Sequence, residues 1–384
     1  MGCCASSNAS NVAVEKDRRR LSVGAVDGSA GAASDDKDTD GGNRGAIASL
    51  GEQSLLDVIT QAGMPDGRRV SVGSQTDQGT TSFANKSITS MGDELDPASS
   101  GIGYTCRKGL KPESPNQDSW FVLKTENFSM YAVFDGHGQK GHDVSQFAKD
   151  ALPKLIIKDP RSREQLWEPC LLDAFKTTQS FILTSDKMKT LSAQMSGTTA
   201  TMAIHDHLKD EITIAHVADS TAAMGVKNGT TWTGEALTRD HKPNLKDEKA
   251  RIEKAGGRVV FDGYANHRVY AKNARYPGLN MSRCLGDLLG HKECGMSAEP
   301  EISTVPVEQG KEQIFLVCSD GVWEFITAQE AITLVSGFPS HKAPAAADTL
   351  AKEAWDRWIK EEGGSVVDDI TVVIVYLGKQ RKGD

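Results

Sequence analysis

Apolar and alternating runs of strand length recur along the chain after residue 100, separated by polar or glycine-containing segments. Such runs predict β-strands, and they span residues 119–124, 129–134, 199–205, 211–217, 222–226, 313–318 and 370–377. A polar stretch separates the third run from the fourth, as in a β-hairpin. Because the strands come in groups with helical patterns between the groups, the order predicts an α+β fold with antiparallel sheets rather than a doubly wound one.

Apolar residues at helical spacing predict four helices in the same region. Two are long, over residues 164–185 and 345–361, and two are shorter, over 142–157 and 245–255. The last of these is expected to stop at a pair of glycines. Residues 54–59 carry a further short amphipathic pattern, which we interpret as a transient helix rather than as a docking segment.

The first hundred residues have a different composition. Residues 21–100 are rich in Gly, Ser, Ala and Asp, contain few aromatic residues, and carry twelve acidic against five basic side chains. A segment of this kind cannot bury enough apolar surface to offset the entropy lost on ordering. The chain is therefore predicted to comprise an anchor segment at 1–20, an acidic and mostly disordered linker at 21–100, and one folded domain at 101–384.

The chain begins Met-Gly-Cys-Cys-Ala-Ser, the pattern of N-myristoylation with Gly2 as the acceptor. Cys3 and Cys4 follow directly and are candidate palmitoylation sites. One myristoyl chain binds a membrane only marginally, so stable anchoring needs a second signal. The two cysteines can supply it, as can a basic cluster that attracts anionic lipid, formed by Lys16, Arg18, Arg19 and Arg20. We therefore expect a lipid-anchored protein on the cytoplasmic face of a membrane; the alternative is a chance match in a disordered tail.

Composition and charge exclude several classes of protein. The fractions of 38% hydrophobic and 25% charged residues are ordinary for a soluble protein. A net charge of −8 argues against a general nucleic-acid binder, and no window approaches about 18 consecutive apolar residues, so no membrane-spanning helix is expected. The seven cysteines include no Cys-x-x-Cys pair, which argues against a disulfide framework or a structural zinc site. Nothing in the sequence indicates an obligate oligomer, and a monomer is expected.

Acidic residues stand at the ends of the strand-like runs. Asp118 precedes one run, Asp135 follows another, Asp320 lies just after a third, and Asp368 and Asp369 open a fourth. Carboxylates at strand ends can converge on one edge of a sheet, and hard divalent cations such as Mg²⁺ and Mn²⁺ prefer such all-oxygen sites. The pattern therefore predicts a metal–carboxylate enzyme.

The segment 136–141 satisfies G-x-G-x-x-G between a predicted strand and a predicted helix, which is the context of a dinucleotide-binding loop. We reject that interpretation because Asp135 would repel the pyrophosphate and because the chain lacks a regular βαβ alternation. Around a metal the same residues fit better. Gly136 can present its backbone carbonyl to a cation, and His137 lies where it could transfer a proton.

Nine motifs give the chain a specific resemblance, over roughly residues 101–378, to the metal-dependent Ser/Thr protein phosphatases of type 2C, the PPM family. In the order of that family they are Asn116-Gln117-Asp118, Val133-Phe134-Asp135-Gly136-His137-Gly138, Ser196-Gly197-Thr198-Thr199-Ala200, Val217-Ala218-Asp219-Ser220, Leu237-Thr238-Arg239-Asp240-His241-Lys242-Pro243, Arg251-Ile252-Glu253-Lys254-Ala255-Gly256-Gly257, Ser282-Arg283-Cys284-Leu285-Gly286-Asp287, Ser319-Asp320-Gly321-Val322-Trp323 and Asp368-Asp369-Ile370-Thr371. Each motif is weak alone, but nine in order leave little room for chance.

The resemblance implies a central β-sandwich of two antiparallel sheets with helices on both outer faces, a four-layer α-β-β-α arrangement. It implies a Ser/Thr phosphoprotein phosphatase that binds two Mg²⁺ or Mn²⁺ ions. A water bridging the two ions would attack phosphorus in line, and His137 would protonate the departing oxygen.

Carried over residue by residue, the resemblance makes Asp135 the bridge between the two ions. Asp118 and the Gly136 carbonyl would serve one ion, and Asp320 and Asp368 would hold the other. Asp369 is then assigned to a supporting position.

Departures from the family pattern leave a second interpretation open. An arginine that often grips the substrate phosphate is missing, and we predict Lys111 in its place. Gln194 stands where an acidic residue often binds a third ion, and Thr221 replaces a common arginine. These changes would suit a catalytically weak module that only binds phosphoproteins, although the intact carboxylates argue for an active enzyme.

Overall fold

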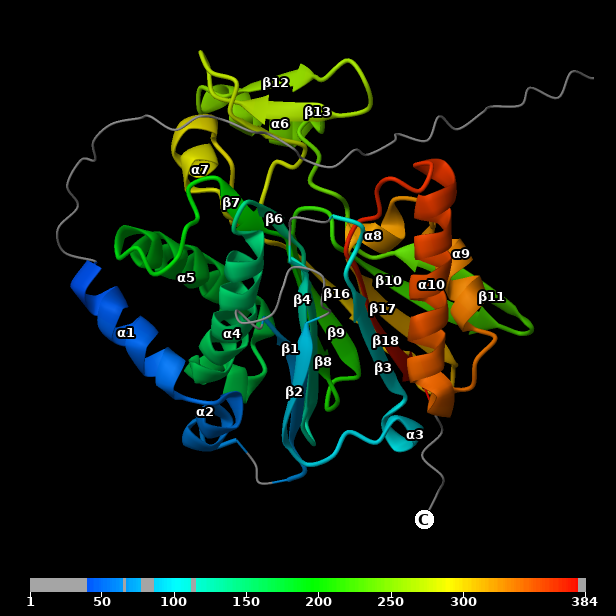
Figure 1. Ribbon diagram of the computed structural model, residues 1–384. Helices are drawn as coiled ribbons and strands as arrows, with labels where there is room; N and C mark the ends of the chain where they lie inside the picture. Colours follow the sequence, from blue (N-terminus) through cyan, green and yellow to red (C-terminus); the bar gives the residue numbers. More distant parts are fainter. Residues whose placement is uncertain (1–39, 65–66, 77–85, 112–114, 379–384) are drawn as a thin grey trace, which may run out of the picture.

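The computed structural model describes residues 40–64, 67–76, 86–111 and 115–378. The predicted anchor at 1–20, with Gly2, Cys3 and Cys4, lies outside these residues. Two antiparallel sheets pack face to face in the centre of the molecule, and helices cover the outer face of each (Figure 1). The predicted four-layer α+β sandwich is therefore confirmed.

The larger sheet has seven strands. In spatial order they are β16 (Glu301–Pro306), β9 (Glu211–Val217), β8 (Ala200–Asp206), β5 (Phe128–Phe134), β4 (Ser119–Lys124), β1 (Val70–Gln75) and β2 (Ser87–Gly92). The smaller sheet has five, in the order β11 (Thr231–Ala236), β10 (Thr221–Asn228), β17 (Gln313–Cys318), β18 (Ile370–Leu377) and β3 (Ile102–Arg107). The predicted strands are all present, including the hairpin, which β8 and β9 form.

Strand β5 shows why these runs are apolar throughout. Met130, Ala132 and Phe134 pack with the helices on one face, whereas Tyr131 and Val133 pack between the two sheets. Successive side chains of a strand point to opposite faces, so a strand covered on both sides must be apolar at every position.

Helices form the two outer layers. Over the seven-stranded sheet lie α4 (Gly141–Lys158) and α5 (Trp167–Lys187), with α1 (Asp40–Glu52) and α2 (Leu55–Gln61) packed outside them. Over the five-stranded sheet lie α8 (Asp320–Trp323), α9 (Ala328–Val335) and α10 (Ala343–Glu361). Short turns of helix occur at α3 (Pro97–Ser100), η1 (Pro160–Glu164) and η2 (Ser340–Lys342). No helix in the described ranges is long and apolar enough to cross a membrane.

A smaller unit sits at one end of the sandwich, at the top of Figure 1. It combines α6 (Lys246–Lys254) and α7 (Leu288–Cys294) with a three-stranded sheet of β12 (Arg258–Phe261), β13 (His267–Tyr270) and β14 (Pro277–Leu279). We call this unit the flap. Below it, a short sheet joins β6 (Gly136–Gly138), β7 (Ser196–Thr198) and β15 (Leu285–Gly286).

The structure corrects the predicted linker at 21–100. From residue 40 onward the segment contributes α1, α2, β1 and β2, and β1 lies inside the large sheet between β4 and β2. The predicted transient helix at 54–59 is also wrong, because Val58 and Ile59 of α2 are fully buried against the domain. The average composition of a long window hid these short apolar clusters, whose burial offsets the entropy of ordering.

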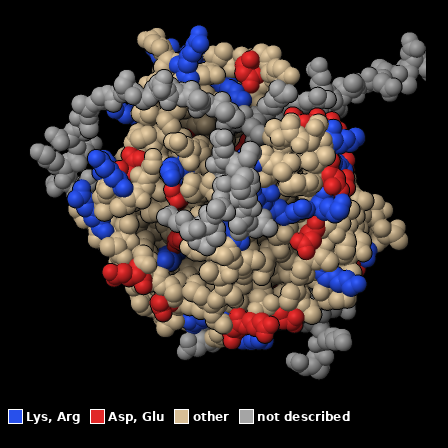
Figure 2. Space-filling view, in the orientation of Figure 1, with Lys and Arg blue, Asp and Glu red and all other residues tan. Residues whose placement is uncertain are grey.

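Charged side chains of both signs lie on the surface of the described residues (Figure 2). On the face shown in Figure 2, acidic and basic side chains are interspersed over the described residues.

Candidate active site

Strand ends bring the four predicted metal carboxylates together at one end of the sandwich. Asp118 precedes β4, Asp135 lies between β5 and β6, Asp320 opens α8 just after β17, and Asp368 lies two residues before β18. Burial raises the pKa of Asp135 well above its usual range, and the negative charges of the other three carboxylates raise it further. Four carboxylates that repel one another in this way are a ready site for a cation.

One carboxylate oxygen of Asp118 has no hydrogen-bond donor among the described residues. Its Oδ2 accepts hydrogen bonds from Ser319 Oγ at 2.9 Å and Thr371 Oγ1 at 2.7 Å. Its Oδ1 is buried and has no hydrogen-bond partner among the described residues. Burial, followed by the charge of Asp369, raises the pKa of Asp118 to about 7. A buried carboxylate oxygen without a hydrogen bond is costly unless a cation or a water molecule binds to it, so Asp118 fits the predicted metal site.

The neighbouring pair of aspartates divides into two roles. Asp369 accepts the backbone amide of Gly109 on Oδ1 and that of Gln117 on Oδ2, each at 2.7 Å. Asp368 Oδ1 accepts the amide of Asp369 at 2.8 Å and contacts the ammonium of Lys111. Both oxygens of Asp369 are thus committed to holding two loops, which leaves Asp368 as the member of the pair that can bind a cation.

Two lysines reach into the acidic cluster. Burial alone would lower the pKa of Lys111, but the charges of Asp368 and Asp369 outweigh it and hold the pKa above its ordinary value. Lys86 donates to Ser119 Oγ at 2.7 Å, and burial lowers its pKa to about 8 despite the nearby Asp118. Sequence reasoning missed Lys86 because it fell within the predicted linker.

His137 is paired with an aspartate to which the sequence assigned no role. His137 Nε2 lies 2.5 Å from Asp287 Oδ2, and both side chains are buried. Burial by itself would lower the pKa of His137, but the Asp287 carboxylate outweighs it and raises the pKa. The other ring nitrogen, Nδ1, is buried without a hydrogen-bond partner in the described part of the chain. Asp287 therefore favours the protonated ring and leaves Nδ1 available to the site.

Gly197 on β7 packs directly against the side chains of His137 and Asp287. A Cβ added there would lie 2.2 Å from Asp287 Oδ2 and 2.8 Å from His137 Nε2, closer than carbon and these atoms can approach. The glycine of the Ser-Gly-Thr motif is thus required by close approach of the histidine–aspartate pair.

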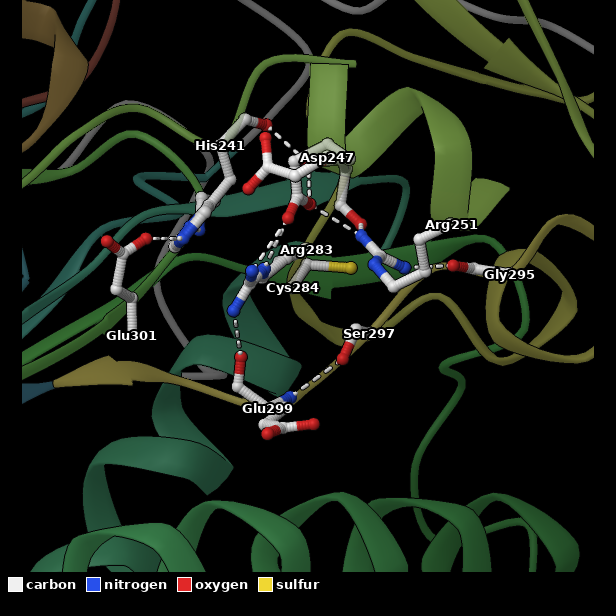
Figure 3. Close-up of polar contacts among 12 residues, drawn as sticks. His241, Asp247, Arg251, Arg283, Cys284, Gly295, Ser297, Glu299 and Glu301 are labelled. Atoms are coloured by element: carbon white, nitrogen blue, oxygen red, sulfur yellow. Dashed lines mark hydrogen bonds and ion pairs between the residues drawn. The ribbon is translucent and has the colours of Figure 1, made fainter. Parts of the chain in front are cut away.

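A buried glutamate ties the flap to this region. Glu248 on α6 accepts hydrogen bonds from Arg283 at 2.6 Å, Arg251 at 2.5 Å and Ser282 Oγ at 2.5 Å. Figure 3 shows Arg251 and Arg283, which come from two different segments. Burial would raise the pKa of Glu248, but the bonds from Arg283, Ser282 and Arg251 lower it to about 2. This network fixes the segment that carries Cys284 and Asp287.

Two other groups of metal-ligating side chains occur in the described ranges, with all ligand atoms within 4.8 Å of one another. They are His137 with Cys284 and Asp287, and His216 with His241 and Glu301. The four predicted carboxylates are not among these groups. One of them, Asp368, is paired with the ammonium of Lys111.

A four-layer sandwich with buried carboxylates at its strand ends and a histidine–aspartate pair beside them defines a metal-dependent hydrolase. The protein phosphatase 2C family model matches residues 110–362, so the chain belongs to the protein phosphatase 2C family. It is a metal-dependent Ser/Thr protein phosphatase.

Curated relatives and solved structures agree with this assignment. The chain is 34% identical over 276 residues to "Probable protein phosphatase 2C 61" of Arabidopsis thaliana, covering 69% of this chain and 81% of the relative. It is 31% identical to "Probable protein phosphatase 2C 35" of the same plant, covering 71% and 82%. Among solved structures, serine-threonine phosphatase 2C from Toxoplasma gondii has a TM-score of 0.63 at 20% identity, covering 72% of this chain and 94% of that one, and supports the fold.

Proposed function

We propose that the chain hydrolyses phosphoserine and phosphothreonine in proteins with two Mg²⁺ or Mn²⁺ ions held at the strand ends. Asp135 would bridge the ions, Asp118 and the Gly136 carbonyl would serve one, and Asp320 and Asp368 the other. The unsatisfied Oδ1 of Asp118 is the observation that carries this proposal, because a buried oxygen with no donor is suited to a cation. Bound ions would supply an acidified attacking water and would neutralise charge on the phosphoryl group.

His137 supplies the proton for the leaving group. Asp287 holds Nε2 and keeps the ring protonated, so the proton leaves from Nδ1 to the departing Ser or Thr oxygen. Protonation matters because an alkoxide is a poor leaving group. Asp287 is a positioning residue, since it acts through His137 rather than on the substrate.

Lys111 is proposed to contact the substrate phosphate. Its ammonium is retained among carboxylates by their charge, close to where the phosphoryl group must lie. An ammonium is a compact point charge and a common ligand of phosphate. In the absence of substrate it rests on Asp368, and a dianionic phosphate gives it a second partner.

The test is phosphate release from a phosphothreonine peptide by the full chain, with Mn²⁺, with chelator, and with Asp135→Asn. We expect metal-dependent release that Asp135→Asn abolishes, while Asp356→Asn, an exposed aspartate on α10, serves as the matched control and keeps full activity. Well-folded wild-type protein that releases no phosphate at any Mn²⁺ or Mg²⁺ concentration would instead support the phosphoprotein-binding module.

We further propose that acylation of Gly2, with palmitoylation of Cys3 and Cys4, tethers the enzyme to the cytoplasmic face of a membrane. The support is the N-terminal pattern and its adjacent second signals. Metabolic labelling with an alkyne analogue of myristate tests this in cells, with Gly2→Ala and the control Ser10→Ala. Labelling and membrane recovery should be lost only in Gly2→Ala; equal membrane recovery of both variants would refute the tether.

A further inference from the structure

A second cluster of metal ligands lies beside the carboxylate site and has a different chemistry. Cys284 Sγ lies 3.2 Å from Asp287 Oδ2, which in turn lies 2.5 Å from His137 Nε2. His291 Nε2 lies 3.8 Å from Cys284 Sγ. The first three residues are buried, and their ligand atoms all lie within 4.8 Å of one another. These three residues offer one sulfur, one nitrogen and one oxygen donor. His291 lies outside this group, and its Nε2 is also 3.1 Å from the carbonyl oxygen of Cys284.

We propose that Cys284, Asp287 and His137 form a Zn²⁺ site, which His291 completes as the fourth ligand once its ring leaves the Cys284 carbonyl oxygen. This site is separate from the Mg²⁺ or Mn²⁺ site and inhibits the enzyme when filled. Thiolate and imidazole favour Zn²⁺ over Mg²⁺ and Mn²⁺, which prefer oxygen ligands. Four such donors suit the tetrahedral geometry that Zn²⁺ takes with protein ligands. The inhibitory part rests on the proton transfer assigned to His137; the binding site stands without it.

The positions of the ligands along the chain place them near the start of α7. Cys284, Asp287 and His291 are three and four residues apart, and Asp287 is the residue from which α7 begins. Asp287 is the N-cap of α7 and has a left-handed backbone, and its Oδ2 lies close to Cys284 Sγ and to His137 Nε2 of β6. The small sheet of β6, β7 and β15 fixes that approach.

The present distances are close to those that Zn²⁺ needs. Tetrahedral Zn²⁺ with bonds of about 2.0 Å to nitrogen and oxygen and about 2.3 Å to sulfur places its ligand atoms roughly 3.3–3.6 Å apart. The two contacts of Cys284 Sγ, at 3.2 and 3.8 Å, already bracket that range. As the ion enters, the 2.5 Å contact of His137 Nε2 with Asp287 Oδ2 must open. His291 Nε2 must also leave the carbonyl oxygen of Cys284, which is 3.1 Å away.

Binding must displace protons. Cys284 binds Zn²⁺ as a thiolate, and His137 binds through an unprotonated Nε2, so the proton of each passes to solvent as the bond to the metal forms. His137 is then neutral and fixed by the ion. It no longer holds, with Asp287, the proton needed by the leaving group, and phosphate release falls.

The experiment uses the full chain and measures binding separately from activity. Co²⁺ titration reports a thiolate-to-cobalt charge-transfer band in the near ultraviolet, which the carboxylate site cannot produce. Zn²⁺ affinity is measured by competition with a chromophoric chelator in wild type and in Cys284→Ala. His291→Gln is the second variant, and Cys294→Ala, another buried free cysteine of the flap, is the matched control.

We expect the band in wild type and in Cys294→Ala, its loss in Cys284→Ala, and Zn²⁺ affinity lower by about tenfold or more in Cys284→Ala and in His291→Gln. Zn²⁺ should also inhibit wild type at saturating Mn²⁺ more strongly than it inhibits His291→Gln. A wild-type titration without the band would overturn the site, even if Cys284→Ala failed to fold. If an active enzyme shows the band but is not inhibited by Zn²⁺, the inhibitory role is wrong. If the protein shows the band but releases no phosphate under any condition, the Zn²⁺ site stands and the proposed phosphatase function is refuted.

Discussion

His137 Nε2 lies 2.5 Å from Asp287 Oδ2, although 150 residues separate the two in the chain. The contact joins β6 to the start of α7, and Gly197 of β7 packs against it. The histidine proposed to protonate the leaving group is therefore oriented by the residue that begins α7, and the carboxylate of that residue raises its pKa. In the proposed mechanism, this pair couples catalysis to the position of the flap.

Asp287→Asn is expected to lower kcat by about 100-fold with little change in KM, because the pair acts on the leaving group and does not bind the ground-state phosphate. Steady-state kinetics on a phosphothreonine peptide measure this. In a His137→Gln background the same substitution should add almost nothing, because both changes remove one interaction. Effects that multiplied in the double variant would show that Asp287 acts independently of His137.

Gly197→Ala is expected to abolish phosphate release and to destabilise the fold by about 1–3 kcal/mol, because the new methyl group overlaps Asp287 and His137. Thermal unfolding and activity are measured together. Gly45→Ala on α1, where a Cβ meets nothing within 4 Å, is the control and should leave activity intact and stability unchanged or higher. An active Gly197→Ala enzyme would mean that the pair does not sit against β7.

Glu248 makes stability depend on acid pH. Its pKa falls from 4.5 to about 2 on folding, so its contribution is complete above about pH 4.5 and is lost as pH falls toward 2. Glu248→Gln should lower the free energy of unfolding by about 3 kcal/mol at pH 7 and by less at pH 3.5. Urea denaturation at both values measures the difference, with exposed Glu253→Gln on the same helix as the control. An equal loss at both pH values would rule out the assigned charge network.

The N-terminal segment should be part of the folded domain. Ile59 of α2 is fully buried, whereas Ile88 of β2 is 57% exposed. Ile59→Ala is therefore expected to cost about 2–5 kcal/mol of stability, and Ile88→Ala about 0.5 kcal/mol or less. Denaturant unfolding of the two variants is compared. Equal stabilities of the two variants would mean that α2 does not pack stably on the domain and is a transient helix.

The periodicity of apolar residues in the sequence was sufficient to predict the strands of the sandwich and the helices that cover it. Runs such as 129–134 are apolar at every position because both faces of β5 are covered, and α5 and α10 show the spacing of long amphipathic helices. Strand β1 escaped notice because only two of its residues, Val70 and Val72, join the core between the sheets. The acidic, glycine-rich composition of the surrounding segment favoured a linker and concealed this short apolar pattern.

The acidic part of the site was also predictable, since aspartates at strand ends are visible in the sequence. The partners that tune it were not. Asp287 and Cys284 meet His137 only through the fold, and Lys86 reaches Ser119 from a segment that composition assigned to a linker. Local sequence cannot indicate which distant side chains share a buried pocket.

Equilibrium dialysis of Mn²⁺ against the full chain tests the central claim most directly. Wild type should bind two ions, and Asp118→Asn, which alters the carboxylate with the unsatisfied oxygen, should lose at least one of them together with phosphate release. The exposed variant Asp356→Asn should match wild type. A folded wild-type protein that binds no Mn²⁺, or an Asp118→Asn variant that binds as many ions as wild type, would contradict the assignment of the metal site.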